Sequence, residues 1–474
     1  MRMRPVEDAL LLCVRAERSP AEQERLRSLL ASLELEPHPP AAGAHGAAVD
    51  AGAVAPGAAA SVAGAGRTAS LVSVSPHAEM ERGGEGRDPA PVPAWSKAGA
   101  EGPPRDQRPT WQRLWREAAH QQVLPLVART LAGAAVAAAL PPAVVQYAKG
   151  LRLRTMLHNM AVHAELGRIG ARLHVHGIPA APLKGSHLAE RLYRALDARQ
   201  VGDIDILVPD DDVVAARAVL RDMGYVPGQP ASPGIEEHSF HGVPLVRHEG
   251  GSTFVVELHW QLNNPQFVTI DYTRLWRRIL ASGSDRAPLR PLPAEELLLF
   301  LSLHLAKHEN GVLRLLADVD RLVRREAAAL DWPYAVALAR HWSVAGLLYF
   351  ALQRAQALLD TPLPGWVLPH LAPAPWRRAL VGLLAGPSAI LRPLPDEHLH
   401  YNRFRLAYCI MLDPPNRAVA AYRHYLFAPA ASRSSGVLLG TVDCARRLAR
   451  GLAWTGLVLG SALVDRWPSM QRGK

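Results

Sequence analysis

The sequence predicts an α+β fold in which a small mixed β-sheet with flanking helices is followed by a mostly helical C-terminal domain. Between residues 177 and 292, short apolar runs typical of strands, at 180–183, 204–208 and 253–262, alternate with helical patterns at 186–195 and 209–223. From residue 293 to 474, leucine-rich segments with helical spacing follow one another, separated by prolines. Hydrophobic residues make up 49% of the 474 positions, which is enough for a sizeable core.

The region before the sheet divides into three parts. Residues 1–36 form a predicted helical segment, in which Ser19-Pro20-Ala21-Glu22 has the composition of a helix start. Residues 37–109 are dominated by Ala, Gly and Pro, and we expect a disordered insert there. Residues 110–176 form a helical lead-in with a long helix over 141–176. Two apolar faces are expected in this lead-in, formed by Trp111, Leu114, Trp115 and Ala118, and by Val144, Tyr147, Leu151, Met156, Met160 and Leu166.

The composition narrows the class of protein. The net charge of +10 favours anionic partners, which include nucleotides, nucleic acid and anionic membrane surfaces, although a GC-rich genome also explains the abundance of Arg, Ala, Pro and Gly. The three cysteines are far apart, which argues against a disulfide framework and indicates a cytoplasmic protein. The N-terminal apolar run is interrupted by Glu7 and Asp8, unlike a signal peptide. The apolar stretch 451–464 is shorter than the roughly 20 residues of a membrane span.

Two carboxylates stand on one face of the predicted strand at 204–208. Asp203 and Asp205 are two positions apart, so their side chains point the same way, while Ile204 and Ile206 point to the core. Like charges at this spacing repel each other unless a cation lies between them, and oxygen ligands suit Mg²⁺, with Mn²⁺ as an alternative. Glu257, flanked by apolar strand residues, is the candidate for a third carboxylate.

A glycine–serine step precedes these carboxylates. Lys184, Gly185 and Ser186 connect the first predicted strand to a helix. Glycine lets a phosphate approach the backbone, serine can cap a helix or donate a hydrogen bond, and lysine adds positive charge. This pattern predicts a phosphate-binding loop that faces a metal-binding strand.

Each of these residues also has a structural interpretation. Asp203 and Asp205 can belong to a solvated strand edge, and Gly185 and Ser186 to an ordinary turn and cap. Glu257 can form an ion pair with an arginine or a histidine. Lys184 can simply be a charge at the entry to a helix. The combination of all these features favours the functional interpretation.

The stretch LKGSHLAERLY…DIDILV, followed by VELHW and HLAKH…D, resembles the bacterial "uncharacterised nucleotidyltransferase" family of the DNA polymerase beta-like nucleotidyltransferase superfamily. The resemblance covers roughly 110–330, with a helical similarity at 5–35, and it implies a nucleotidyltransferase core at 177–292. It implies that Gly185 and Ser186 hold a nucleoside triphosphate, with Lys184, and that Asp203, Asp205 and Glu257 are catalytic residues that bind Mg²⁺. Because the spacing from Ser186 to Asp203 is longer than in many superfamily members, Arg194 and Arg199 are also candidates for phosphate contacts.

The implied reaction is transfer of a nucleoside monophosphate from an NTP to a hydroxyl acceptor, with release of pyrophosphate. The acceptor is open, with a small molecule or a protein favoured and nucleic acid not excluded. One alternative is a non-catalytic NTP-binding sensor. Another is an accessory protein for surface polysaccharide production that contacts the membrane through its basic C-terminal region.

Several further polar residues are candidates for a supporting role. His259 follows Glu257 on the same strand face and is expected beside the metal ligands. His304 and His308 are four apart on a predicted helix, with Asp318 beyond, and this spacing is compatible with zinc. We expect these three residues instead to line the nucleotide cleft or to hold the helical domain against the core. The stretch 451–464 next to Arg446, Arg447 and Arg450 fits a helix on a membrane surface or, more simply, a buried core helix.

Overall fold

A computed structural model describes most of the chain. It covers residues 5–33, 110–228, 242–263, 267–282, 287–307, 313–386, 389–391 and 397–414, with the further positions 265, 416–419, 421 and 456. The predicted insert at 37–109 lies outside these residues, as do Arg446, Arg447 and Arg450. The limits proposed for the domains remain a prediction.

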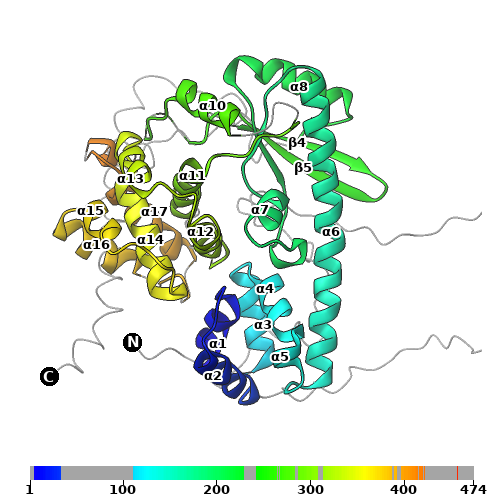
Figure 1. Ribbon diagram of the computed structural model, residues 1–474, viewed down its shortest axis with the longest axis vertical. Helices are drawn as coiled ribbons and strands as arrows, with labels where there is room; N and C mark the ends of the chain where they lie inside the picture. The colour runs from blue at the N-terminus through cyan, green and yellow to red at the C-terminus, as the bar shows by residue number, and fades with distance from the viewer. Residues whose placement is uncertain are drawn as a thin grey trace, which may run out of the picture.

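The N-terminal helices pack together at one end of a long helix (Figure 1). They are α1 (Pro5–Val14), α2 (Pro20–Ala31), α3 (Trp111–His120), α4 (Leu124–Ala132) and α5 (Ala134–Ala137), and the long helix is α6 (Pro142–Val175). The helix start predicted at Ser19 is confirmed, because its hydroxyl accepts from the Glu22 N–H and the Glu22 carboxylate accepts from the Ser19 N–H. The four apolar residues expected to share a face of α3 are all buried.

The predicted apolar face of α6 is only partly correct. Val144 and Leu166 are buried, but Met156 and Met160 are 37% and 49% exposed. The helix packs against α4 near its beginning and against α8 (Val213–Asp222) and the sheet near its end. The outward face of its middle is not used in these contacts, so helical spacing of apolar residues did not predict burial there.

The expected mixed sheet is confirmed, and five strands of it lie within the described residues. Its order is β1 (Ala181–Pro182), β2 (Ile204–Leu207), β5 (Ser252–His259), β4 (Gly242–Glu249) and β3 (Val226–Pro227). Strands β2 and β5 are parallel, and the other neighbouring pairs are antiparallel. The three strands predicted from sequence correspond to β1, β2 and β5. Strand β4 was not predicted, because a proline within an apolar run argues against a strand, and Pro244 lies in its middle.

One face of the sheet carries the apolar residues of its central strands. Ile204 and Ile206 of β2 and Val256 and Leu258 of β5 are buried with residues of α6 and α8. Since side chains alternate along a strand, the residues between them must point to the other face. That face carries the carboxylates of the candidate site.

The described residues that follow the sheet are mostly helical, as predicted from residue 293 onward. They form α10 (Tyr272–Ala281), α11 (Ala294–Lys307), α12 (Leu313–Arg325), α13 (Trp332–His341), α14 (Ala345–Leu359), α15 (Val367–Leu371), α16 (Pro375–Ala385) and α17 (Glu397–Met411). Helices α11–α17 lie to one side of the sheet (Figure 1). Their core is continuous with that of the N-terminal helices, and the Arg321 guanidinium donates to the Val14 carbonyl at 2.8 Å.

Two arginines of the basic C-terminal region are not available to a membrane surface. Arg377 is buried and ion-paired with Asp413, and Arg403 is buried and donates to the Leu383 carbonyl. Across the described part of the chain, none of the helices has both the length and the apolar character needed to cross a bilayer.

Candidate functional site

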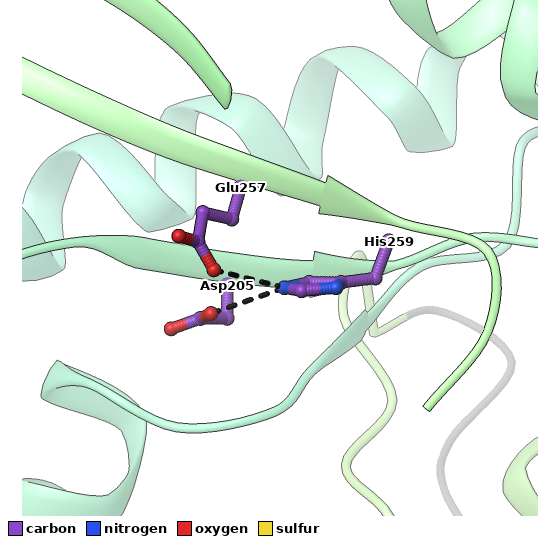
Figure 2. A group of neighbouring side chains, drawn as sticks. All are labelled: Asp205, Glu257 and His259. Carbon is purple, nitrogen blue, oxygen red and sulfur yellow. Dashed lines mark hydrogen bonds and ion pairs between the residues drawn. The ribbon is translucent and has the colours of Figure 1, made fainter. Parts of the chain in front are cut away.

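The candidate site is built on the parallel pair of strands β2 and β5. Asp205 in β2 is aligned with Glu257 in β5, and Leu207 with His259. Asp203 directly precedes β2 and is two residues from Asp205, so it shares the same face. Figure 2 shows the carboxylates of Asp205 and Glu257 with the imidazole of His259 turned toward both of them. The register therefore brings together residues that are more than 50 positions apart in the chain.

Asp205, Glu257 and His259 form a compact group of possible metal ligands. The His259 Nε2 atom lies 3.1 Å from Asp205 Oδ1 and 3.4 Å from Glu257 Oε2. Each of the three residues offers one possible metal-ligand atom, and these three atoms all lie within 4.8 Å of one another. The Asp205 side chain is fully buried, and its second oxygen, Oδ2, has no hydrogen-bond partner. A buried carboxylate oxygen left unpaired is costly, and a hard cation would satisfy it.

Lys184 lies among the same carboxylates. Its Nζ atom is 3.0 Å from Asp205 Oδ1, 3.4 Å from Asp203 Oδ2 and 4.0 Å from Glu257 Oε2. The lysine comes from the turn after β1, which pairs with β2 on the side away from β5. The Lys184 side chain is only 10% exposed, so the carboxylates are its immediate surroundings and not bulk solvent.

Burial and mutual contact shift the pKa values of these groups. Burial, with the neighbouring charge of Asp203, raises the pKa of Asp205 to about 6 despite the nearby lysine. Burial alone would lower the pKa of His259, but its hydrogen bonds to Asp205 and Glu257 outweigh that effect and raise the pKa to about 9. Burial would likewise lower the pKa of Lys184, yet the carboxylates of Asp203, Asp205 and Glu257 raise it above its ordinary value.

The Gly185–Ser186 loop packs directly against the carboxylate strand. Gly185 has φ +70° and ψ −137°, and a Cβ added to it would lie 2.9 Å from the Asp203 carbonyl oxygen. Glycine is therefore required both by conformation and by space. Ser186 is buried, and its hydroxyl has no hydrogen-bond partner. The helix that follows, α7 (Ser186–Arg191), is shorter than the predicted 186–195, so its dipole adds little to anion binding.

Arg199 and Asp318 form a buried ion pair behind this loop. The Arg199 Nε and Nη2 atoms donate to the two carboxylate oxygens of Asp318, each at 2.9 Å, and Nη1 lies 3.3 Å from the Gly185 carbonyl. Asp318 belongs to α12, so the pair links the helical half to the loop. A phosphate contact by Arg199 remains a prediction, while these contacts support a role in positioning the loop.

Two of the remaining predicted residues, His304 and Arg194, belong to the described part of the chain. His304 on α11 is buried and stacks on Phe300 with ring centroids 5.9 Å apart. His308 lies outside the residues that the structure describes, so the spacing of the two histidines is not tested. Arg194 is exposed and has φ +50°.

Sequence reasoning missed two residues that belong to the Arg199–Asp318 cluster. The Tyr193 hydroxyl donates to Asp318 Oδ1 at 2.8 Å, and Arg314 Nη1 lies 4.0 Å from Asp318 Oδ2. Burial and the charge of Arg199 lower the pKa of Arg314 to about 10. Tyr193 lies 125 positions from Asp318, so no local pattern in the sequence indicates that contact. Arg314 lies four residues before Asp318 on α12, and this spacing was the signal that could have indicated their ion pair.

A family model matches the part of the chain that contains the candidate site. A model of the family described as "Uncharacterised nucleotidyltransferase" matches residues 107–360, which is more than half of the chain. The match includes every strand of the sheet, the Gly185–Ser186 loop and the Arg199–Asp318 cluster. No curated protein and no solved structure matches the chain significantly.

Proposed function

Because this chain belongs to the uncharacterised nucleotidyltransferase family, we propose that it transfers a nucleoside monophosphate from an NTP to a hydroxyl acceptor and releases pyrophosphate. The observation that carries the proposal is the convergence of Asp203, Asp205 and Glu257 on one sheet face beside the Gly185–Ser186 loop. Three carboxylates next to a glycine-dependent loop are costly to assemble for structural reasons alone. They suit a reaction that needs cation binding and phosphate binding side by side.

The residues present fit a divalent cation such as Mg²⁺ or Mn²⁺. Carboxylate oxygens are the ligands that these ions prefer, and the unpaired Oδ2 of buried Asp205 is an available one. Asp203, Asp205 and Glu257 would hold the ion, with His259 orienting Asp205 and Glu257 through its contacts to both. When bound, a divalent ion stabilises the negative charge on the oxygens of the phosphoryl group that is transferred.

The other residues bind and orient the reactants in this proposal. Gly185 lets the triphosphate approach the backbone, and the unpaired Ser186 hydroxyl donates a hydrogen bond to a phosphate oxygen. The acceptor oxygen forms a bond to the α-phosphorus as the bond to the pyrophosphate oxygen breaks. Glu257 is the most exposed of the three carboxylates, at 23%, and this exposure supports a role in receiving the proton of the acceptor hydroxyl.

The test is transfer of label from NTPs that carry ³²P at the α-phosphate, incubated with the protein, Mg²⁺ and a cell extract as the source of acceptors. We expect labelled product and released pyrophosphate with the wild type and neither with D203A/D205A. D211A is the matched control, because Asp211 is an exposed aspartate of the 3₁₀ turn Asp210–Asp212 and is not part of strand β2. Circular dichroism confirms that each variant is folded.

The other outcomes separate the alternatives. If NTP binds in the presence of Mg²⁺ but no label is transferred to any acceptor, the protein is an NTP-binding sensor and not a transferase. If neither Mg²⁺ nor Mn²⁺ supports NTP binding, the carboxylates are structural and the proposed function is wrong. The identity of the labelled product would name the acceptor class.

A further inference from the structure

The position of Lys184 has a consequence for how the metal would bind. Its ammonium lies 3.0, 3.4 and 4.0 Å from oxygens of Asp205, Asp203 and Glu257, the same three residues proposed to hold the cation. We propose that Lys184 occupies the place of the divalent ion when no metal is bound, and that metal binding displaces it toward the nucleotide phosphates. This inference rests on the proposed function.

The three carboxylates need a nearby positive charge, which Lys184 supplies. Three carboxylates bring three negative charges to one face, and the Asp205 side chain is fully buried. Buried carboxylates require nearby positive charge. The lysine side chain is itself nine-tenths buried and has three N–H donors. Without a metal, its positive charge and the contacts of His259 together keep the three carboxylates in place.

Lys184 and a divalent ion cannot occupy the same carboxylate site together. A divalent ion would bring its carboxylate ligands to roughly 2.0–2.1 Å, whereas an ammonium keeps them near 3 Å. Asp205 Oδ1 already contacts both Lys184 and His259. A doubly charged ion at the same carboxylates would repel the ammonium and remove the attraction that holds it. Lys184 therefore has to leave when the metal binds.

The displaced lysine would move toward the phosphates of a nucleotide bound at the Gly185–Ser186 loop. Lys184 directly precedes Gly185, whose φ of +70° turns the backbone against the Asp203 carbonyl. The next residue, Ser186, has a buried hydroxyl without a partner. A triphosphate bound at this loop is the negative charge within reach of the released ammonium. Metal binding would thus free a cation for the nucleotide, and the two ligands would bind cooperatively.

The direct test measures Mn²⁺ affinity without nucleotide, by electron paramagnetic resonance of the free ion. We expect K184M to bind Mn²⁺ about tenfold more tightly than the wild type, because the competing charge is removed. K184R is the matched control, since it keeps a positive charge and is expected to bind no more tightly than the wild type. The melting temperature should fall in K184M without metal and should rise more on Mn²⁺ addition than that of the wild type.

Two results would overturn the proposal in different ways. If K184M and the wild type bind Mn²⁺ equally well, lysine does not compete with the ion, and the proposed function remains intact. If neither protein binds Mn²⁺, the metal site itself is wrong, and the proposed function fails together with this inference. Cooperativity is tested by adding a non-hydrolysable NTP, which should tighten Mn²⁺ binding more in the wild type than in K184M.

A second measurement needs no variant, because the chain has only five lysines, namely Lys97, Lys149, Lys184, Lys307 and Lys474. An amine-reactive reagent, followed by mass spectrometry of the peptides, reports how accessible each ammonium is. Lys149 is exposed on α6 and serves as the internal control. We expect saturating Mn²⁺ to raise labelling of Lys184 several-fold relative to Lys149. Unchanged labelling of Lys184 in protein that has bound Mn²⁺ would overturn the displacement.

Discussion

Replacing Asp318 with leucine is expected to destabilise the protein strongly. Its carboxylate is fully buried and accepts three hydrogen bonds, two from Arg199 at 2.9 Å each and one from Tyr193 at 2.8 Å. In D318L, the buried guanidinium of Arg199 loses its counter-ion while Arg314 remains close to it. Two buried positive charges then have no carboxylate between them.

The size of the effect follows from the burial of both partners. Breaking a buried ion pair by removing one member costs about 3–5 kcal/mol, because the other charge stays desolvated. With an entropy of unfolding of about 2.1 cal/mol/K per residue, this corresponds to a fall in melting temperature of roughly 3–5 °C for cooperative unfolding of the 474-residue chain. The double variant R199M/D318L removes both charges and keeps similar volume, so it should recover at least about half of the loss.

Urea denaturation followed by tryptophan fluorescence and a thermal melt by circular dichroism are the assays. D211L, at an exposed aspartate, is the control and should change the free energy of unfolding by about 0.5 kcal/mol or less. A loss below about 1 kcal/mol in D318L would refute the buried ion pair. A double variant as unstable as D318L would show that the loss comes from packing and not from unpaired charge.

Two further predictions concern a glycine and a cysteine. G185A is expected to lose about 3 kcal/mol of the free energy of unfolding in urea and to bind NTP more weakly, because Gly185 has a positive φ and lies close to the Asp203 carbonyl. G177A is the control, since Gly177 also has φ +70° but lies in open space, and it should lose only about 1 kcal/mol. Equal losses would show that the contact with Asp203 is unimportant. Burial raises the pKa of the Cys13 thiol to about 12, so the group stays a neutral thiol as the pH rises to 9. Peptide mapping should therefore find Cys13 unmodified by iodoacetamide at pH 9 until the protein is unfolded in urea. Rapid labelling of Cys13 in the folded protein would contradict this prediction.

The alternation of residues along one strand was sufficient to predict part of the site. Asp203 and Asp205 share a face because strand side chains alternate, and the structure places them as that rule requires. The position of Glu257 followed from the same reasoning, because a carboxylate among apolar strand residues needs a partner. The sheet order that brings β5 beside β2 could not be derived from the strands themselves, since β4 with its proline was not predicted.

Asp318 was expected to line the nucleotide cleft or to hold the helical domain against the core, but its partner in the core could not be predicted from the sequence. The pairing of Arg199 with Asp318 spans 119 positions and depends on how α12 packs against the loop. A charged side chain is usually solvated, so neither partner indicates its own burial. For the same reason, Arg199 was predicted to contact phosphate, and Lys184 was not predicted to lie among the carboxylates.

The fold and the candidate site depend on a single register between β2 and β5. A slip of one residue would move Ile204, Ile206, Val256 and Leu258 out of the core and turn the carboxylates into it. The burial of the apolar face thus selects the register that aligns Asp205 with Glu257, so no other interaction is needed to fix this register. The cost lies in the repulsion among the carboxylates, and Lys184 and His259 offset it. The stability of this face is therefore coupled to whichever cation it holds, which makes the behaviour of Lys184 informative about both folding and function.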